Sequence, residues 1–172
     1  MAHPDSYALD VLGMILGHGR TSRLHRALVE TGLATEADAA NETARDPFLV
    51  VALATAVPYR PLAEVEAAIL REVARLRTEP VSEKELRRAK KQVEAGFLYS
   101  KDSIQSLSHQ LGYYETIASW RYLEEYPSKI RAVSADDVRR VASTYLIDDA
   151  LTVGWFDPPQ NGDEAVAAGG EA

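Results

Sequence analysis

Apolar residues recur at helical spacing along much of the chain, and the clearest run lies between Pro61 and Pro80. Its apolar residues, each three or four positions from the next, are Leu62, Val65, Ile69, Val73 and Leu76. This spacing places them on one face of a helix, and proline cannot continue a helix interior. The pattern therefore predicts a helix that buries one face and ends at Pro80.

Capping residues indicate where other helices begin. Ser82 is followed three positions later by Glu85, and Ser134 by Asp137, which is the spacing of a capping box. A break is expected near Ser119. Together with the apolar spacing, these signals predict helices over residues 4–16, 21–32, 82–100, 103–119, 120–133 and 134–146.

Three segments instead favour strands. Residues 48–57 are rich in β-branched side chains, residues 33–44 alternate weakly, and a turn lies between them, so an antiparallel pair is predicted. "ALTVGWFDP" at residues 150–158 predicts a third strand. The fold class is therefore α+β, with a two-layer, mainly antiparallel sheet covered by helices. Because three strands are few for so many helices, we expect the first strands of the sheet to be absent from this chain.

The composition of the chain disfavours several classes of partner and excludes two kinds of site. The chain has 26 acidic residues against 19 Lys plus Arg, a net charge of -7, which disfavours nucleic acid and anionic lipid as partners. The absence of cysteine excludes disulfides and thiolate metal sites. No apolar run is long enough to span a bilayer, so a soluble chain is expected, in either the periplasm or the cytoplasm.

The motifs that could carry chemistry favour structural roles. "GHGRTS" follows a helix and lacks the Gly-Lys-Ser/Thr ending of a phosphate loop, so it is interpreted as a turn between helices. The four histidines are scattered, and no Gly-x-Ser-x-Gly sequence occurs. The run "KELRRAKK" is interleaved with glutamates and indicates a solvated helix face. No catalytic residue and no metal ligand is predicted.

Four segments, in this order, resemble the insulinase/pitrilysin-like (M16-type) zinc metallopeptidases. They are "HPDSYALDVLGMILGHGRTSRLHRALVETGLATEADA", "SEKELRRAKKQVEAGF", "IRAVSADDVRRVASTYL" and "LTVGWFDP". The resemblance is to the C-terminal, non-catalytic half in the processing-peptidase-like branch. It implies one domain over residues 1–158, and residues 159–172 have the composition of a disordered tail.

In this family, two homologous halves close around an unfolded peptide, and the N-terminal half binds zinc through a His-x-x-Glu-His motif. This chain contains neither that motif nor its reverse. The resemblance therefore implies a chain without cofactor that is inactive alone, with zinc in a partner half. Its implied role is to close the substrate chamber and help position the peptide.

The substrate-contact candidates follow from the same resemblance: Gly17, Gly19, Arg20, Arg26 and Thr35. Many family members place an arginine and a tyrosine around the "GLA" segment, but here Thr35 follows Ala34 and the nearest arginine is Arg26. This departure keeps a second interpretation open, a structural subunit of the same fold without peptidase activity. The expected partners are the zinc-bearing half, a peptide substrate and a second copy at an exposed sheet edge.

Overall fold

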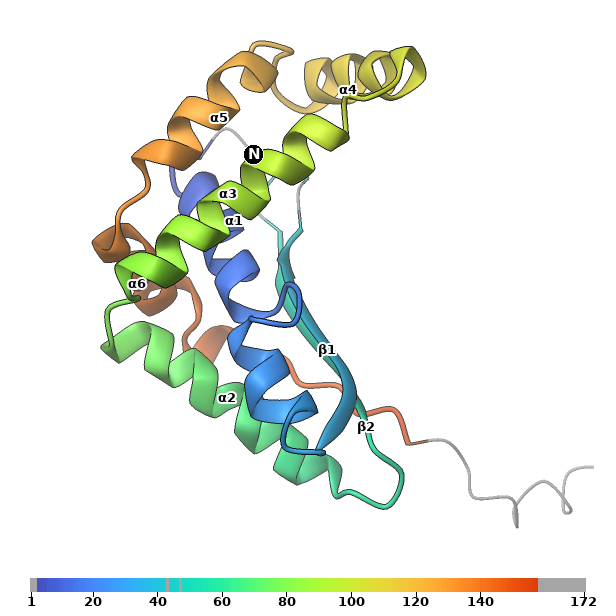
Figure 1. Cartoon of the computed structure of the whole chain (residues 1–172), viewed down its shortest axis with the longest axis vertical. Helices are drawn as coiled ribbons and strands as arrows, with labels where there is room; N and C mark the ends of the chain where they lie inside the picture. The colour runs from blue at the N-terminus through green and yellow to red at the C-terminus, as the bar shows by residue number, and fades with distance from the viewer. Residues whose placement is uncertain (1–2, 43, 47, 158–172) are drawn as a thin grey trace, which may run out of the picture.

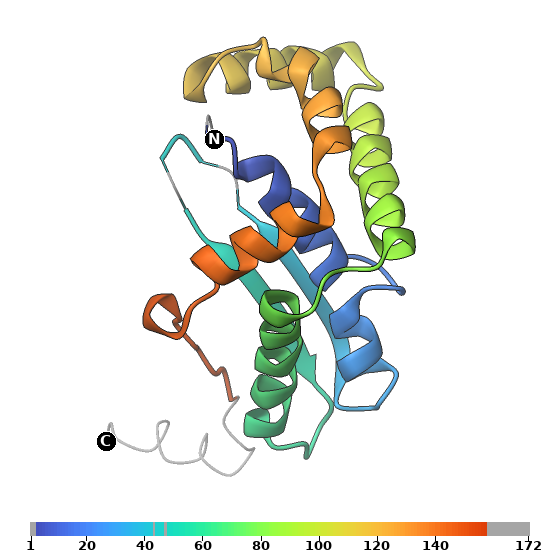
Figure 2. The same ribbon diagram turned by 90° about the vertical axis from the view of Figure 1, so that its left-hand side faces the viewer.

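A two-stranded antiparallel sheet lies along one side of the molecule in the computed structural model, and the helices cover one of its faces (Figure 1). The strands are β1 (Ala34–Asn41) and β2 (Val50–Ala56). The structure describes residues 3–42, 44–46 and 48–157. Viewed from the helical side, the helices lie in front of the sheet (Figure 2). The predicted two-layer α+β class is confirmed.

The helical layer contains α-helices of 11 to 17 residues and two short helices of other types. They are α1 (Ser6–Leu16), the π-helix η1 (His25–Val29), α2 (Leu62–Thr78), α3 (Glu83–Tyr99), α4 (Ile104–Ile117), α5 (Tyr122–Ala132), α6 (Ala135–Tyr145) and the 3-10 helix η2 (Asp148–Ala150). Within the described residues, no helix has both the length and the apolar composition that a membrane span requires.

Helix α1 is the centre of the packing. It contacts β1 on one side and α3, α5 and α6 on others. Most of its apolar side chains are buried, as expected of a helix that is apolar over much of its circumference. The largest fully buried side chains of the core are Val11, Leu12, Ile15, Leu16, Leu24, Leu28, Leu76, Ile130, Val138 and Val141.

The predicted helix starts after Ser82 and Ser134 are confirmed. The Ser82 hydroxyl accepts a hydrogen bond from the Glu85 N–H at 3.3 Å. At α6, the Ser134 hydroxyl accepts from the Asp137 N–H at 3.1 Å, and the Asp137 carboxylate accepts from the Ser134 N–H at 2.9 Å. Local side chains therefore satisfy donors that the first turn of each helix leaves free.

The register of the hairpin determines which residues face away from the helices. Asp38 lies opposite Leu53, and Glu36 lies opposite Thr55, and all four are exposed. The alternate residues, such as Ala39, pack against the helical layer. Thr35 is the extra residue where the register shifts between Ala34 and Glu36. The hairpin thus has one packed face and one exposed face.

The predicted third strand is wrong, and one predicted helix differs in length and type. The described part of the predicted third strand, residues 151–157, pairs with no other strand, because an extended segment becomes a strand only beside a hydrogen-bonding neighbour. The helix predicted over residues 21–32 is present but shorter, and its main part is the five-residue π-helix η1, where Glu30 N–H donates to His25 O, five residues back. Residues 159–172, predicted as a tail, lie outside the described residues.

Candidate functional site

The turn after α1 holds most of the residues that the sequence proposed as substrate contacts, and it contains two glycines, one required by close packing and one by its backbone conformation. A Cβ atom added at Gly17 would lie 1.8 Å from the backbone nitrogen of Ala39 in β1. Glycine therefore lets the end of α1 rest directly on the sheet. Gly19 has a φ of 77°, a left-handed conformation in which glycine carries no steric cost.

A buried ion pair fastens this turn to α3. Arg23 donates two hydrogen bonds to the Glu85 carboxylate, at 3.0 Å from Nε and 3.1 Å from Nη2. Both side chains are largely buried, with exposed fractions of 7% and 11%. Arg26 adds a longer contact, 3.7 Å from its Nη2 to a Glu85 oxygen. We call Arg23, Arg26 and Glu85 the clasp.

The charges of the clasp hold Glu85 in its ionised form. Burial alone would raise the pKa of Glu85, but the hydrogen bonds and positive charges of Arg23 and Arg26 outweigh it, so the pKa is lowered. A further bond runs from Arg88 Nη2 of α3 to the Thr21 carbonyl oxygen at 2.8 Å. The clasp and this bond fix the path of residues 21–26.

The remaining candidates do not gather at the clasp. Arg20 is exposed on the turn. Thr35 lies on β1, where its hydroxyl donates to the Thr55 carbonyl oxygen at 3.2 Å. Its hydrogen-bonding capacity is thus used within the hairpin, and Arg26 is held by Glu85 and by the Ser22 carbonyl oxygen. The five candidates therefore do not form one site in the described structure.

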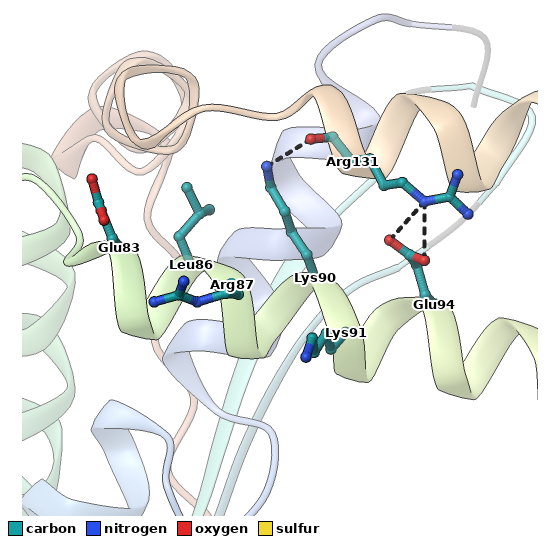
Figure 3. Close-up of a pocket in the computed structure, with 7 residues that line it drawn as sticks. All are labelled: Glu83, Leu86, Arg87, Lys90, Lys91, Glu94 and Arg131. Atoms are coloured by element: carbon teal, nitrogen blue, oxygen red, sulfur yellow. Dashed lines mark hydrogen bonds and ion pairs between the residues drawn. The ribbon is translucent and has the colours of Figure 1, made fainter.

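A shallow hollow of about 350 Å³ lies along α3, with Arg131 of α5 at its side (Figure 3). Its lining residues are Glu83, Leu86, Arg87, Lys90, Lys91, Glu94 and Arg131. Lys90 Nζ donates to the Arg131 carbonyl oxygen at 2.8 Å, and Arg131 Nε lies 3.2 Å from the Glu94 carboxylate. Two of the cations are thus used to join α3 to α5. The hollow lacks the enclosed apolar walls of a typical small-molecule site.

Sequence reasoning missed the tertiary role of the α3 glutamates. Their interleaving with Lys and Arg indicates a solvated helix face, but Glu85 pairs with the turn and Glu94 with α5. It also missed Asp10 of α1, which accepts from Tyr126 Oη and Asn41 Nδ2, both at 2.8 Å. The sequence signal for this role is a carboxylate, Asp10, within an otherwise apolar helical segment.

An aromatic cluster surrounds Asp10. Tyr122 stacks on both Tyr7 and Tyr114, with ring centroids 5.6 Å and 5.1 Å apart. Tyr126 lies against Phe97, with centroids 4.7 Å apart. The rings join α1, α3, α4 and α5 by direct packing, which explains why aromatic residues recur in these helices.

The metal that such a fold family implies does not fit the described residues of this chain. Among residues 3–42, 44–46 and 48–157, no three His, Asp or Glu side chains are close enough to share an ion. A catalytic zinc needs three protein ligands and an open position for water. No zinc chemistry is therefore assigned to these residues.

Comparisons with known proteins agree with this description. The "Zinc protease PqqE" of Helicobacter pylori (strain ATCC 700392 / 26695) is 25% identical over 157 residues, which is 91% of this chain. The chain spans only 35% of the length of that relative. A crystal structure of a protease from the same species covers 86% of this chain and 36% of its own, with a TM-score of 0.79 and 25% identity.

Two further crystal structures match over most of both chains. A proposed zinc protease from Bordetella pertussis Tohama I has a TM-score of 0.81 and 26% identity, covering 92% of this chain and 87% of its own. The inactive peptidase domain of a proposed zinc protease from Bordetella parapertussis has a TM-score of 0.79 and 25% identity. It covers 94% of this chain and 88% of its own. The family model described as "Peptidase M16 inactive domain" matches residues 1–93, more than half of the sequence. The chain therefore belongs to the peptidase M16 inactive domain family.

Proposed function

We propose that this chain acts as the non-catalytic half of a zinc-dependent endopeptidase, where it closes a chamber around an unfolded peptide and helps position it. The observation that carries this proposal is the match, over 94% of the chain, to the inactive peptidase domain from Bordetella parapertussis. Enclosing a peptide excludes bulk water and orients the scissile bond, which are ways in which a domain without catalytic groups raises a rate.

The catalytic chemistry belongs to the partner half. Zinc bound there would supply the activated water that attacks the peptide bond. This chain would contribute the opposite wall of the chamber. The clasp supports that role, because a turn held to α3 by Arg23 and Glu85 presents a fixed surface rather than a mobile one.

The contacts of Arg26 and Thr35 favour a second candidate function, a structural subunit of the same fold without peptidase activity. Both side chains already have partners within the described chain, Arg26 at Glu85 and Thr35 at Thr55. Because their side chains are already bonded within the chain, Arg26 and Thr35 are better suited to a structural role than to binding a substrate. The two functions differ in whether this chain accelerates hydrolysis when a zinc-bearing half is present.

Reconstitution tests the proposal. The chain is mixed with the zinc-bearing half from the same source, and cleavage of an extended fluorogenic peptide is compared with cleavage by that half alone. We expect a higher rate for the mixture and no cleavage by this chain alone. Arg26→Ala and Thr35→Ala should each change the gain by less than about fivefold, since about 1 kcal/mol is the most that residues shaping a wall contribute.

An unrelated acidic protein of similar size serves as the control for nonspecific rescue of the catalytic half. Sedimentation of the mixture shows whether the two halves associate. If they are folded and associated but the rate stays at that of the catalytic half, the structural-subunit function replaces the peptidase one. A drop of a hundredfold or more in Arg26→Ala would show instead that Arg26 contacts the substrate.

A further inference from the structure

A row of cations lies along the exposed side of α3. Lys84, Arg87 and Lys91 follow one another at spacings of three and four residues, which places them on one side of the helix, and all three are exposed. None of the three makes a hydrogen bond or an ion pair with the described residues of the chain. We call Lys84, Arg87 and Lys91 the ridge.

The carboxylates of α3 leave the ridge without neutralising partners. Glu85 is bound by Arg23 in the clasp, and Glu94 is bound by Arg131 of α5. The third carboxylate of this helix, Glu83, lies one turn before Arg87, yet no ion pair joins the two in the described structure. The ridge therefore keeps its positive charge in a chain whose net charge is -7.

The ridge does not serve the stability of its own helix. Arg87 and Lys91 are like charges one turn apart, which repel, and Lys84 lies in the first turn, where the positive end of the helix macrodipole disfavours a cation. Helices α2 and α5 have acidic residues in the first turn and basic residues in the last, whereas α3 has no basic residue in its last turn. Arrangements that cost local stability are expected at binding surfaces.

The hollow described above lies beside the ridge, on the side toward α5 (Figure 3). Lys90 and Glu94 are both bonded to Arg131, whereas Arg87 and Lys91 have no bond to any other lining residue (Figure 3). The lining contains four cations and two carboxylates. It therefore carries a positive charge on balance, and two of its cations are free to bind an external carboxylate.

We propose that the ridge and the hollow together bind an acidic segment of a partner protein. Alternate side chains of an extended segment are about 7 Å apart, close to the axial separation of about 6 Å between Arg87 and Lys91, so two carboxylates can meet both cations. The half-buried Leu86 in the lining offers an apolar contact between them and the core. Exposed ion pairs are individually weak, so the complex should form through several pairs and weaken as salt is added.

Fluorescence anisotropy of a labelled peptide tests the proposal on the full chain. The probe is a short synthetic peptide with glutamate at alternate positions and serine and one leucine between them. A control peptide has glutamine in place of each glutamate. We expect saturable binding of the acidic probe at low ionic strength, a lower affinity at higher ionic strength, and no binding of the neutral peptide.

Two double variants separate the ridge from the net charge of the chain. Arg87→Gln with Lys91→Gln removes two cations of the ridge, and Arg71→Gln with Lys129→Gln removes two exposed cations of α2 and α5 that also have no partner in the described chain. Both variants change the net charge equally. We expect the first to weaken probe binding about tenfold, the loss of two exposed ion pairs, and the second to bind within about twofold of the parent.

Urea unfolding followed by circular dichroism shows whether the ridge has a structural role instead. Because the substitutions relieve repulsion along α3, the ridge variant should unfold at a urea concentration equal to or higher than that of the parent. Unfolding at a lower concentration would show that these cations hold α3 in place, and would overturn the proposal.

Three binding results would also overturn it. They are equal weakening by the two double variants, equal binding of the neutral peptide, and the absence of saturable binding of the acidic probe at low ionic strength. Tighter binding of a single-stranded oligonucleotide of the same charge would assign the surface to nucleic acid instead. The inference does not rest on the peptidase role, and cleavage is not measured, so its outcome and that of the reconstitution are independent.

Discussion

At the scale of single residues, Gly17 shows how one missing side chain fixes the relation between a helix and a sheet. An alanine Cβ at this position would meet the backbone of Asp38 and Ala39, which cannot rotate away. We expect Gly17→Ala to lower the free energy of unfolding by about 3 kcal/mol, because α1 must shift from β1 to make room. Urea unfolding followed by circular dichroism measures the change.

Gly96 is the matched control for this substitution. It lies inside α3, is exposed, and has no atom within 4 Å of the position that an added Cβ would take. Gly96→Ala should therefore raise the free energy of unfolding by about 0.5–1 kcal/mol, through the better helix propensity of alanine. Similar effects of the two substitutions would show that α1 does not depend on close approach at Gly17.

The residues that sequence analysis identified correctly are those whose partners lie nearby in the chain. Ser134 caps a helix through Asp137, three positions away, and such spacing is visible in the sequence. Arg23 and Glu85 are 62 positions apart, and neither differs in type from the many exposed Arg and Glu residues. The end of the first helix at residue 16 is predicted from the sequence, but the contact of Gly17 with Ala39 depends on how the helix meets the sheet.

At the scale of elements, the clasp joins the turn after α1 to the first turn of α3. In Glu85→Gln, Arg23 stays buried without a counter-ion, so we expect a loss of about 3 kcal/mol in the free energy of unfolding. The exposed pair Arg75–Glu79 supplies the control, since its side chains are 51% and 55% exposed. Glu79→Gln should change the free energy by less than about 0.5 kcal/mol.

A double variant separates the charge from the packing of the clasp. Replacing both Arg23 and Glu85 by methionine removes the buried charges together, so the loss should be smaller than in Glu85→Gln alone. Urea unfolding of the three variants and the parent gives the comparison. If the double variant were the least stable, the ion pair itself would stabilise the turn beyond the cost of burying its charges.

Helices were easier to predict than strands for a physical reason. A helix such as α2 satisfies its own backbone, and the spacing of its apolar residues predicts it, although only Val65 and Leu76 of the five are fully buried. A strand needs a neighbour, and composition alone does not reveal whether one is present. Residues 150–158 have strand composition, yet their described part stays unpaired. A helix is predicted where η1 lies, but its π-helical hydrogen bonds have no clear signal in the sequence.

At the scale of the whole molecule, two carboxylates connect α1 to elements far away in the sequence. Asp5 accepts from Arg140 Nη2 at 2.7 Å and from Tyr145 Oη at 2.8 Å, which joins α1 to α6. Asp10 joins α1 to β1 and α5 through Asn41 and Tyr126. The central helix is thus held at two points, and each point contains a carboxyl group.

The two carboxylates have pKa values displaced in opposite directions. The hydrogen bond from Arg140 is the main cause that lowers the pKa of Asp5, with Tyr145 adding to it against the effect of burial. Burial raises the pKa of Asp10, and the bonds from Asn41 and Tyr126 only partly oppose it. Ionised Asp5 therefore stabilises the fold, whereas ionised Asp10 costs stability.

These displacements predict separate pH windows for two asparagine variants. Asp5 contributes stability above its unfolded pKa of about 4, and loses it as the pH falls through its lower folded value. The free energy of unfolding of Asp5→Asn should be lower than that of the parent at neutral pH, and this difference should shrink below about pH 4. The raised pKa of Asp10 means that ionising it costs stability in the folded state. The stability of Asp10→Asn relative to the parent should therefore rise as the pH increases above about 4, and this difference should become constant above the folded pKa of Asp10. Urea unfolding of the parent and both variants between roughly pH 3 and pH 8 measures these differences in stability. If the stability of each variant stayed a constant amount from that of the parent at every pH, neither carboxylate would be coupled to folding.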